Sequence, residues 1–334
     1  MSTIPAKRRC KRVHRYLWLR LLLTLTITAT MLWLFFASAP SIRATWLWNT
    51  ELITEKGEAI LSFAEENDIN RIYLHIDQKN VPPEAYRTFI KEASARDIQV
   101  DALGGDPAWS LVSSQKSIAS FIDWVHVYNR AAAEDERFTG IHVDIEPHVH
   151  PQWKRDKEAL KSQWMENMQL VVQETKKDPA LQVSADIPFW MNELPASETQ
   201  SVSEWLIGQL DHVTLMAYRD YVEGSNGVLD ISSRILDEAG YDRQKVVVGL
   251  NVLESDEGDR TTFYEEDTKI MREQVSILET RMKKYSAYAG YAIHDYEQWE
   301  KKSRREKERS SAKKTSAESE EKIKESKRAA EEGT

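Results

Sequence analysis

The chain has 334 residues, 41% of them hydrophobic, so it is long enough to bury a large core and is not disordered as a whole. Its formal net charge of −9 hides an uneven distribution, because the stretch between residues 21 and 299 holds 26 basic and 45 acidic residues, a net charge of −19. An acidic body argues against a nucleic-acid partner, since phosphate binding needs a basic surface.

The first 39 residues have the features of a targeting segment. Residues 1–20 carry seven Lys and Arg and no acidic residue, which predicts a basic cytoplasmic flank. The apolar residues 21–39 are enough to cross a bilayer core of ~30 Å, so we expect a transmembrane anchor with everything after it outside the cytoplasm. The alternative is a signal peptide cleaved after Ala39, because Ala37-Ser38-Ala39 fits a cleavage site, and the protein would then be secreted.

From residue 44 onward, short β-rich runs alternate with longer amphipathic stretches, which is typical of βα units and a parallel sheet. The expected strands are Thr45–Asn49, Arg71–Asp77, Gln99–Leu103, Gly140–Glu146, Gln182–Ile187, His212–Tyr218, Lys245–Asn251 and Gly290–Asp295. The expected helices are Ile53–Asn67, Pro83–Ala95, Ser117–Ala133, Lys157–Lys177, Ser203–Leu210, Ile231–Ala239 and Thr262–Lys284, with an eighth beginning near Tyr296. Eight strands predict an α/β fold, a closed (β/α)8 TIM barrel over residues 44–299.

The composition changes abruptly after Trp299. Residues 300–334 contain twelve basic and nine acidic residues and almost no large apolar side chain, Ile323 excepted. Such a segment cannot bury a core, but its interleaved charges can pair at i,i+4 along a helix. We therefore expect a charged tail that is extended and partly helical.

Acidic and aromatic residues gather where the expected strands end. In (β/α)8 enzymes the active site lies at the C-terminal ends of the strands. Carboxylates ringed by Trp and Tyr are typical of carbohydrate sites, because sugar faces stack on rings while acids act on the glycosidic oxygen. The expected substrate contacts are Trp48, Asp106, Trp109, Asp186, Trp190, Met216, Arg219, Asn251 and Trp299.

The fourth expected strand carries three ionisable residues at alternate positions. Because side chains alternate between the two faces of a strand, His142, Asp144 and Glu146 share one face. Asp144 and Glu146 are like charges at close range, so we expect one carboxyl to have a raised pKa, as an acid catalyst needs. A structural network at the barrel mouth is the alternative role for the same residues.

Two of these stretches resemble motifs of a known family. Gly140-Ile141-His142-Val143-Asp144-Ile145-Glu146 resembles the strand-four signature of the chitinase-like glycoside hydrolases of family 18, Gly-x-Asp-x-Asp-x-Glu. Met216-Ala217-Tyr218 is similar to that family's Met-x-Tyr-Asp motif on strand six, and Trp299 is similar to its sugar-stacking Trp. Two positions depart from the family: His142 replaces its first Asp, and Arg219 follows Tyr218 where the family has Asp.

The resemblance implies a role for each matching residue. Glu146 would be the general acid, Asp144 would orient the N-acetyl group of the substrate, and Tyr218 would hydrogen-bond the same group. Catalysis would be substrate-assisted, with the acetamido oxygen as nucleophile and no cofactor or metal. His142 lies beneath Asp144, and we expect the two to pair.

The sequence therefore predicts a membrane-anchored glycoside hydrolase that acts on a carbohydrate polymer bearing N-acetylhexosamine. A barrel that binds a glycan or a protein without catalysis is one alternative. A metal-dependent hydrolase is another, because His142, Asp144 and Glu146 carry metal-capable atoms. Asp186 or Asp106 could also supply the second carboxylate of an ordinary two-acid glycosidase.

Overall fold

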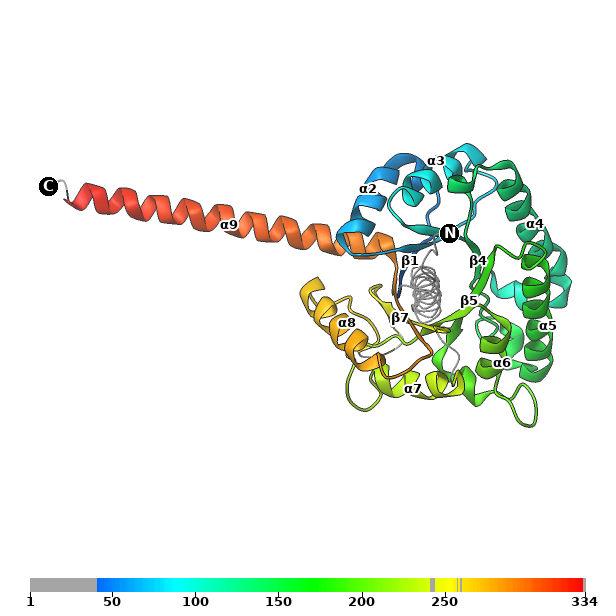
Figure 1. Cartoon of the computed structure of the whole chain (residues 1–334). Coiled ribbons are helices and arrows are strands. Elements are labelled where there is room, and N and C mark those ends of the chain that lie inside the picture. Colours follow the sequence, from blue (N-terminus) through cyan, green and yellow to red (C-terminus); the bar gives the residue numbers. More distant parts are fainter. Residues whose placement is uncertain (1–40, 241–243, 257, 259, 333–334) are drawn as a thin grey trace, which may run out of the picture. The chain divides into compact units, whose positions relative to one another are not determined.

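The computed structural model describes residues 41–240, 244–256, 258 and 260–332. Eight parallel strands close into a barrel in sequence order, with β8 paired to β1 (Figure 1). The strands are β1 (Ile42–Leu47), β2 (Arg71–His75), β3 (Gln99–Gly104), β4 (Gly140–Val143), β5 (Gln182–Pro188), β6 (His212–Met216), β7 (Val246–Asn251) and β8 (Tyr288–His294). The predicted (β/α)8 barrel is confirmed.

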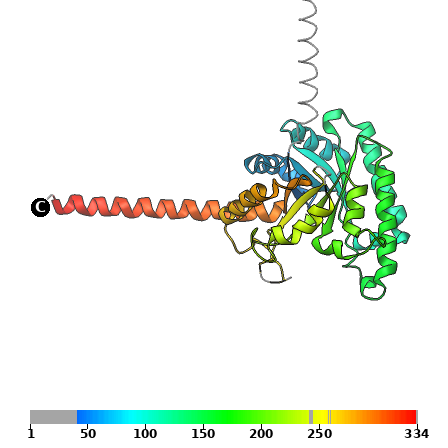
Figure 2. The ribbon, with the colours of Figure 1, turned by 60° about the horizontal axis from the view of Figure 1, so that its bottom comes forward.

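Helices connect consecutive strands and surround them. They are α2 (Leu52–Glu66), α3 (Pro83–Ser94), α4 (Gln115–Ala131), α5 (Lys157–Thr175), α6 (Val202–Gln209), α7 (Val228–Glu238), α8 (Thr268–Met282) and α9 (Tyr296–Glu332). Local signals begin several of them: Pro83 occupies the first turn of α3, and Ser201 accepts a hydrogen bond from the Glu204 N–H of α6. In both views α2 and α5 lie on opposite sides of the strands (Figures 1 and 2).

Alternate residues of each strand serve two different cores. Outward residues such as Ile72 and Leu74 on β2 are fully buried against the helices. Inward residues form a separate cluster inside the barrel, made of Ala44, Trp46, Tyr73, Leu103, Val247, Ala289 and Ala292. This two-sided burial is what a parallel barrel requires, because helices cover its outside and side chains fill its interior.

Polar contacts also cross the barrel interior. Trp46 Nε1 on β1 donates to Asp186 Oδ2 on β5 at 2.9 Å. Tyr73 Oη on β2 lies 3.3 Å from His212 Nε2 and 3.2 Å from Thr214 Oγ1 on β6. Since β1 and β5, like β2 and β6, are four strands apart in a ring of eight, these contacts join opposite walls through the centre.

Several predicted boundaries are wrong, and three of them affect the loops around the strand ends. The fourth strand ends at Val143, so Asp144 and Glu146 lie in the segment that follows it. The sixth strand ends at Met216, before Tyr218. The seventh helix begins at Thr268 rather than Thr262, because Thr262 Oγ1 donates to Leu253 O at 2.6 Å and is held in the loop after β7.

The chain ends are described only in part. The predicted basic flank (residues 1–20) and the predicted anchor or signal segment (residues 21–39) lie outside the described residues. Among the residues that the structure describes, no helix is long and apolar enough to cross a membrane. The charged tail, predicted to be partly helical, continues α9 as one helix to Glu332, and Lys307 Nζ on this helix lies 2.8 Å from Glu66 Oε2.

A buried ion pair ties β2 to β3 inside the barrel. Arg71 Nη1 lies 2.6 Å from Asp101 Oδ2, and the two side chains are 4% and 1% exposed. We expect Asp101→Asn to lower the free energy of unfolding by about 3–5 kcal/mol, because it leaves the guanidinium buried without its charge partner. Urea unfolding measures the loss. The control Glu279→Gln removes a half-exposed partner 3.7 Å from Arg43 and should cost less than about 1 kcal/mol; equal losses would contradict the prediction.

Candidate active site

The segment directly after β4 places Asp144 and Glu146 at the C-terminal ends of the strands. The Asp144 N–H donates to Gly104 O at 3.0 Å, which extends the pairing of β3 with β4 by one residue. Gly105 allows this close approach, because a Cβ at that position would stand 1.9 Å from the Asp144 carbonyl oxygen. The backbone of β3 therefore fixes where the Asp144 side chain begins.

A buried carboxylate lies in the barrel interior near Asp144. Asp186 on β5 is 5% exposed, and its Oδ2 accepts the hydrogen bond from Trp46 and lies 3.0 Å from His142 Nε2. The expected pairing of His142 with Asp144 is therefore wrong. The physical reason is register: His142 pairs with Ser184 across β4 and β5, so its ring lies level with β5, whereas Asp144 begins only after β4 has ended.

The His142 ring is held by contacts at both nitrogens and along one face. Its Nδ1 lies 2.8 Å from Ser184 Oγ, and its ring stacks on Tyr73 with centroids 3.7 Å apart and planes 7° from parallel. With Asp186 at Nε2, the ring has a contact at both nitrogens and along one face. This residue is part of the barrel core, and its side chain is fully buried.

Burial raises the pKa of Asp144 well above its ordinary value, and the neighbouring carboxylates of Asp186 and Glu146 raise it further. The raised pKa expected for one member of the Asp144 and Glu146 pair therefore falls on Asp144. Within the described part of the chain, Asp144 Oδ1 and Asp186 Oδ1 are both buried without a hydrogen-bond partner. Unpartnered buried oxygens are uncommon in folded proteins and often mark functional positions.

Glu146 reaches the surface of the site. Its side chain is 30% exposed, and Oε2 lies 3.2 Å from His148 Nε2. Burial lowers the pKa of His148, which favours its neutral form. The His148 ring meets Trp190 edge to face at 5.2 Å, and Trp190 lies in the 3₁₀ helix η5 (Phe189–Glu193) after β5. The structure thus brings Glu146 and Trp190 to the same part of the mouth through His148.

Tyr218 and Trp48 meet at a residue that was not among the predicted contacts, His294. Trp48 Nε1 donates to His294 Nε2 at 3.1 Å, and the Tyr218 ring lies 6.0 Å from the His294 ring with planes 21° apart. Burial lowers the pKa of His294, in keeping with a neutral ring that accepts this hydrogen bond. Its place as the last residue of β8 is the sequence signal that could have identified it.

Trp299 does not reach the strand ends. It lies on α9, is 3% exposed, and its ring packs edge to face on Phe63 of α2 at 5.2 Å. The prediction that a sugar stacks on Trp299 is wrong, because β8 ends at His294 and the first turns of α9 carry Trp299 to the outer layer.

Asp106 and Arg219 are bound by their own loops. Asp106 Oδ1 accepts a hydrogen bond from the Ala108 N–H at 2.7 Å and caps the 3₁₀ helix η1 (Pro107–Ser110). Arg219 donates to Tyr218 O at 2.6 Å and to Asn226 Oδ1 at 2.9 Å. Both side chains therefore have local structural roles, and Asp106 is placed as a cap rather than as a second catalytic acid.

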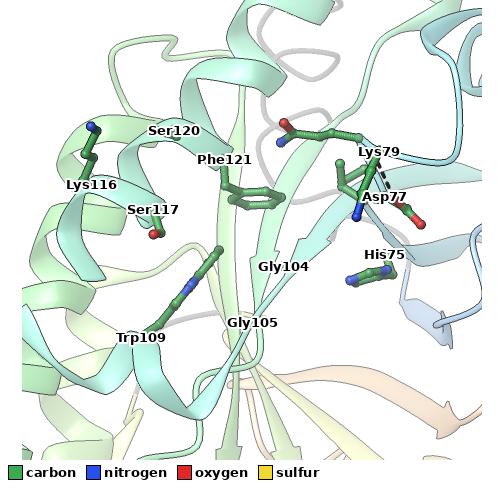
Figure 3. A pocket seen from close by; sticks show the side chains of 12 residues that line it. His75, Asp77, Lys79, Gly104, Gly105, Trp109, Lys116, Ser117, Ser120 and Phe121 are labelled. Carbon is green, nitrogen blue, oxygen red and sulfur yellow. Dashed lines mark hydrogen bonds between the residues drawn. The ribbon is translucent and has the colours of Figure 1, made fainter. Parts of the chain in front are cut away.

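The other three predicted contacts have different surroundings. Asn251 ends β7, is 7% exposed, and its Oδ1 accepts from the Leu253 N–H at 3.0 Å. Met216 ends β6 and pairs with Gly249 of β7. Trp109 is half-buried and lines a pocket of about 670 Å³ beside the ends of β2 and β3 (Figure 3).

The proposed metal ligands do not converge. Among the described residues, no three His, Cys, Asp or Glu side chains are grouped so that they could hold a metal ion. Within the predicted trio, His142 is directed at Asp186 and Glu146 at His148. The described residues therefore give the metal-dependent alternative no ligand set.

Comparisons with known proteins identify the fold. No protein-family model and no curated protein matches the chain. A GH18 chitinase from Cycas revoluta in complex with (GlcNAc)3 is similar in structure, with a TM-score of 0.50 and 14% identity over 77% of this chain and 96% of that one. The C-terminal domain of a putative chitinase from Desulfitobacterium hafniense DCB-2 gives a TM-score of 0.53 and 12% identity over 77% and 94%. The chain thus has the barrel fold of the GH18 chitinases, as the resemblance predicted, at 12–14% sequence identity to these two structures.

The raised pKa of Asp144 has a consequence for stability. Because the folded state holds this proton more tightly than the unfolded state, the contribution of Asp144 to stability is full below the unfolded pKa of about 3.9 and is lost as pH rises toward the folded pKa. Asp144→Asn should therefore raise the melting temperature relative to the wild type at pH 7, with a smaller difference at pH 4. Thermal unfolding across this range measures it, with exposed Asp123→Asn on α4 as control; a difference that does not change with pH would contradict it.

Proposed function

We propose that the barrel is a glycoside hydrolase that acts on a glycan containing N-acetylhexosamine, with Glu146 as general acid. The observation that carries the proposal is that a half-exposed Glu146 and a partly buried Asp144, whose pKa is raised, both follow β4 at the strand ends of a chitinase-type barrel. The neighbour from Cycas revoluta, a chitinase in complex with (GlcNAc)3, supports this class of substrate.

The two carboxyls have different environments and so can take different roles. Glu146 reaches solvent and can give a proton to the glycosidic oxygen as the bond from that oxygen to C1 breaks. Asp144 Oδ1, buried and without a protein partner among the described residues, can hydrogen-bond the N-acetyl group and turn its carbonyl oxygen toward C1. That oxygen forms the new bond to C1, and a water molecule later opens the cyclic intermediate while Glu146 takes back a proton.

Tyr218 supplies a second hydrogen-bonding group two strands away from Asp144. It follows β6, whereas Asp144 follows β4, and its ring stacks on His294 at the end of β8. A phenol held by an aromatic neighbour can keep the acetamido group in the orientation that attack on C1 needs. The role of Tyr218 is part of the proposal and rests on this position.

A glycan-binding barrel without turnover is the second candidate. Two observations favour it: His148 lies 3.2 Å from the proposed acid Glu146, and His142 rather than a carboxylate precedes Asp144 on the strand. In the family's Gly-x-Asp-x-Asp-x-Glu pattern, three successive acidic residues could pass a proton along to the last one. In this chain His142 stands at the first of these three positions. Turnover of an N-acetylated glycan decides between the two candidates.

Removal of the acid tests the proposed reaction. We expect Glu146→Gln to lower kcat about 10²- to 10⁴-fold on N-acetylhexosamine oligosaccharides, because the amide cannot protonate the leaving oxygen. Substrate affinity should stay within a few-fold, since the amide keeps the shape of the carboxyl. Release of reducing ends and titration calorimetry measure the two effects. Glu134→Gln, an exposed residue before β4 at the other end of the barrel, is the control, and a fully active Glu146→Gln enzyme would refute the assignment.

We also propose that residues 21–39 hold the barrel at the outer side of the membrane. The support is the seven basic residues within residues 1–20, followed by an apolar run long enough to span a bilayer. Mass spectrometry of the full chain from a membrane fraction should then find residues 1–39 still attached. A mature chain that begins at Pro40 would show instead that the leader is a cleaved signal peptide.

A further inference from the structure

A pocket of about 670 Å³ opens beside the proposed catalytic residues. Its floor includes Gly104 and Gly105 at the end of β3, and Gly105 is the residue packed against the Asp144 carbonyl. The pocket therefore lies at the same end of the barrel as the candidate active site, one strand away from it. Its volume is within the range of ligand sites in proteins, about 300–1,000 Å³.

The two walls of this pocket each carry a lysine. Lys79 comes from the loop between β2 and α3, and Lys116 comes from the first turn of α4 on the opposite side (Figure 3). Among the described residues, neither ammonium group forms an ion pair, whereas lysines such as Lys161 and Lys176 do. Two cations thus border one hollow of a body whose net charge is −19 between residues 21 and 299.

The one carboxylate of the pocket is already engaged. Asp77 Oδ1 accepts the N–H groups of Lys79 and Asn80 at 3.0 Å each, and Oδ2 accepts Asn80 Nδ2 at 2.7 Å. The hydrogen bond from the Asn80 side chain, followed by that from its backbone, lowers the pKa of Asp77, so it stays ionised within its turn. His75 is kept neutral by burial, which lowers its pKa. The pocket lining therefore has an excess of one positive charge.

The rest of the lining suits a sugar ring. Trp109 is half-buried, and its ring lies 5.6 Å from Phe121, which packs over Gly104. An aromatic surface of this kind can stack on the apolar face of a sugar. Ser117 and Ser120, both exposed on α4, add hydroxyl groups on the same wall (Figure 3).

We propose that this pocket is a subsite for a sugar unit that carries a carboxylate, with Lys79 and Lys116 as the groups that recognise the charge. The proposal rests on the proposed function, since it names the substrate class as an acidic N-acetylated glycan. Trp109 stacks on the ring, and the lysines bind the carboxylate from both walls. Elsewhere the acidic body repels such a polymer, so the positive pocket also selects the register in which the glycan lies across Asp144 and Glu146.

The test compares two oligosaccharides that differ only in charge. In the first oligosaccharide, every second N-acetylhexosamine unit carries a lactyl group with a free carboxylate. In the second, the same carboxyl groups are methyl esters. Binding is measured by calorimetry on the full chain with Glu146→Gln, so that no turnover interferes. We expect the acid to bind about tenfold more tightly than the ester at low salt and the preference to shrink as salt rises.

The lysine variants identify the source of that preference. Lys79→Gln and Lys116→Gln should each weaken binding of the acid about threefold, and the double variant about tenfold, with the ester unaffected. Lys283→Gln, an exposed lysine at the far end of α8, is the matched control and should change neither affinity. The subsite would be refuted if the double variant kept the full preference for the acid. It would also be refuted if the Glu146→Gln chain with both lysines bound the acid and the ester equally or bound neither.

Failure of the subsite can be told apart from failure of the proposed function. Hydrolysis is measured on the wild-type chain and on the Lys79→Gln/Lys116→Gln double variant, both with Glu146 intact. If both proteins hydrolyse the acid and the ester at equal rates, the proposed hydrolase activity stands and the subsite is refuted. If neither oligosaccharide is hydrolysed but the double variant loses the preferential binding of the acid, the subsite stands and the hydrolase falls.

Discussion

The carboxylate of Asp186 is the group on which the geometry of the candidate site depends. Burying a carboxylate inside a barrel is costly unless donors surround it. Trp46 reaches Asp186 from the opposite wall, and His142 lies 3.0 Å from the same oxygen. Three strands are thereby fixed relative to one another below the mouth. Burial raises the pKa of Asp144 most, and the negative charge of Asp186 raises it further, so a core residue influences the protonation of a group at the strand ends.

Much of this arrangement followed from strand alternation in the sequence. β-rich runs at regular spacing predicted eight strands, and the inward positions near their ends include Trp48, Asp144 and Tyr218, which the structure brings to the mouth, and Asp186, which lies just below it. A raised pKa for one acid was also predicted, from two carboxylates two residues apart, although the charge of Glu146 contributes less to it than burial and the charge of Asp186 do. That the shift falls on Asp144 was not predictable, since it depends first on burial of that carboxyl and then on Asp186, a residue 42 positions away in the sequence.

The errors in the prediction have a common physical cause. The partner of His142 depends on the register between β4 and β5, and a sequence pattern gives the faces of a strand but not its level beside a neighbour. Trp299 was misplaced because a shift of a few residues at the start of α9 decides between mouth and outer layer. Arg219 was misplaced for a similar reason: it bonds Asn226 in the same loop, and a sequence pattern does not give the path of a loop backbone.

The proposed general acid and the two lysines of the proposed subsite lie at separate places, and this separation would let both act at the same end of the barrel. An ammonium group next to Asp144 would stabilise its ionised form and cancel the raised pKa. Lys79 and Lys116 instead border the hollow at β2 and β3, and Gly104 and Gly105 leave that hollow open beside β4. A long substrate can span both places, whereas a single sugar unit cannot. If the pocket binds a carboxylate as proposed, the barrel would recognise charge without disturbing Asp144, and the substrate would be a polymer of at least a few units.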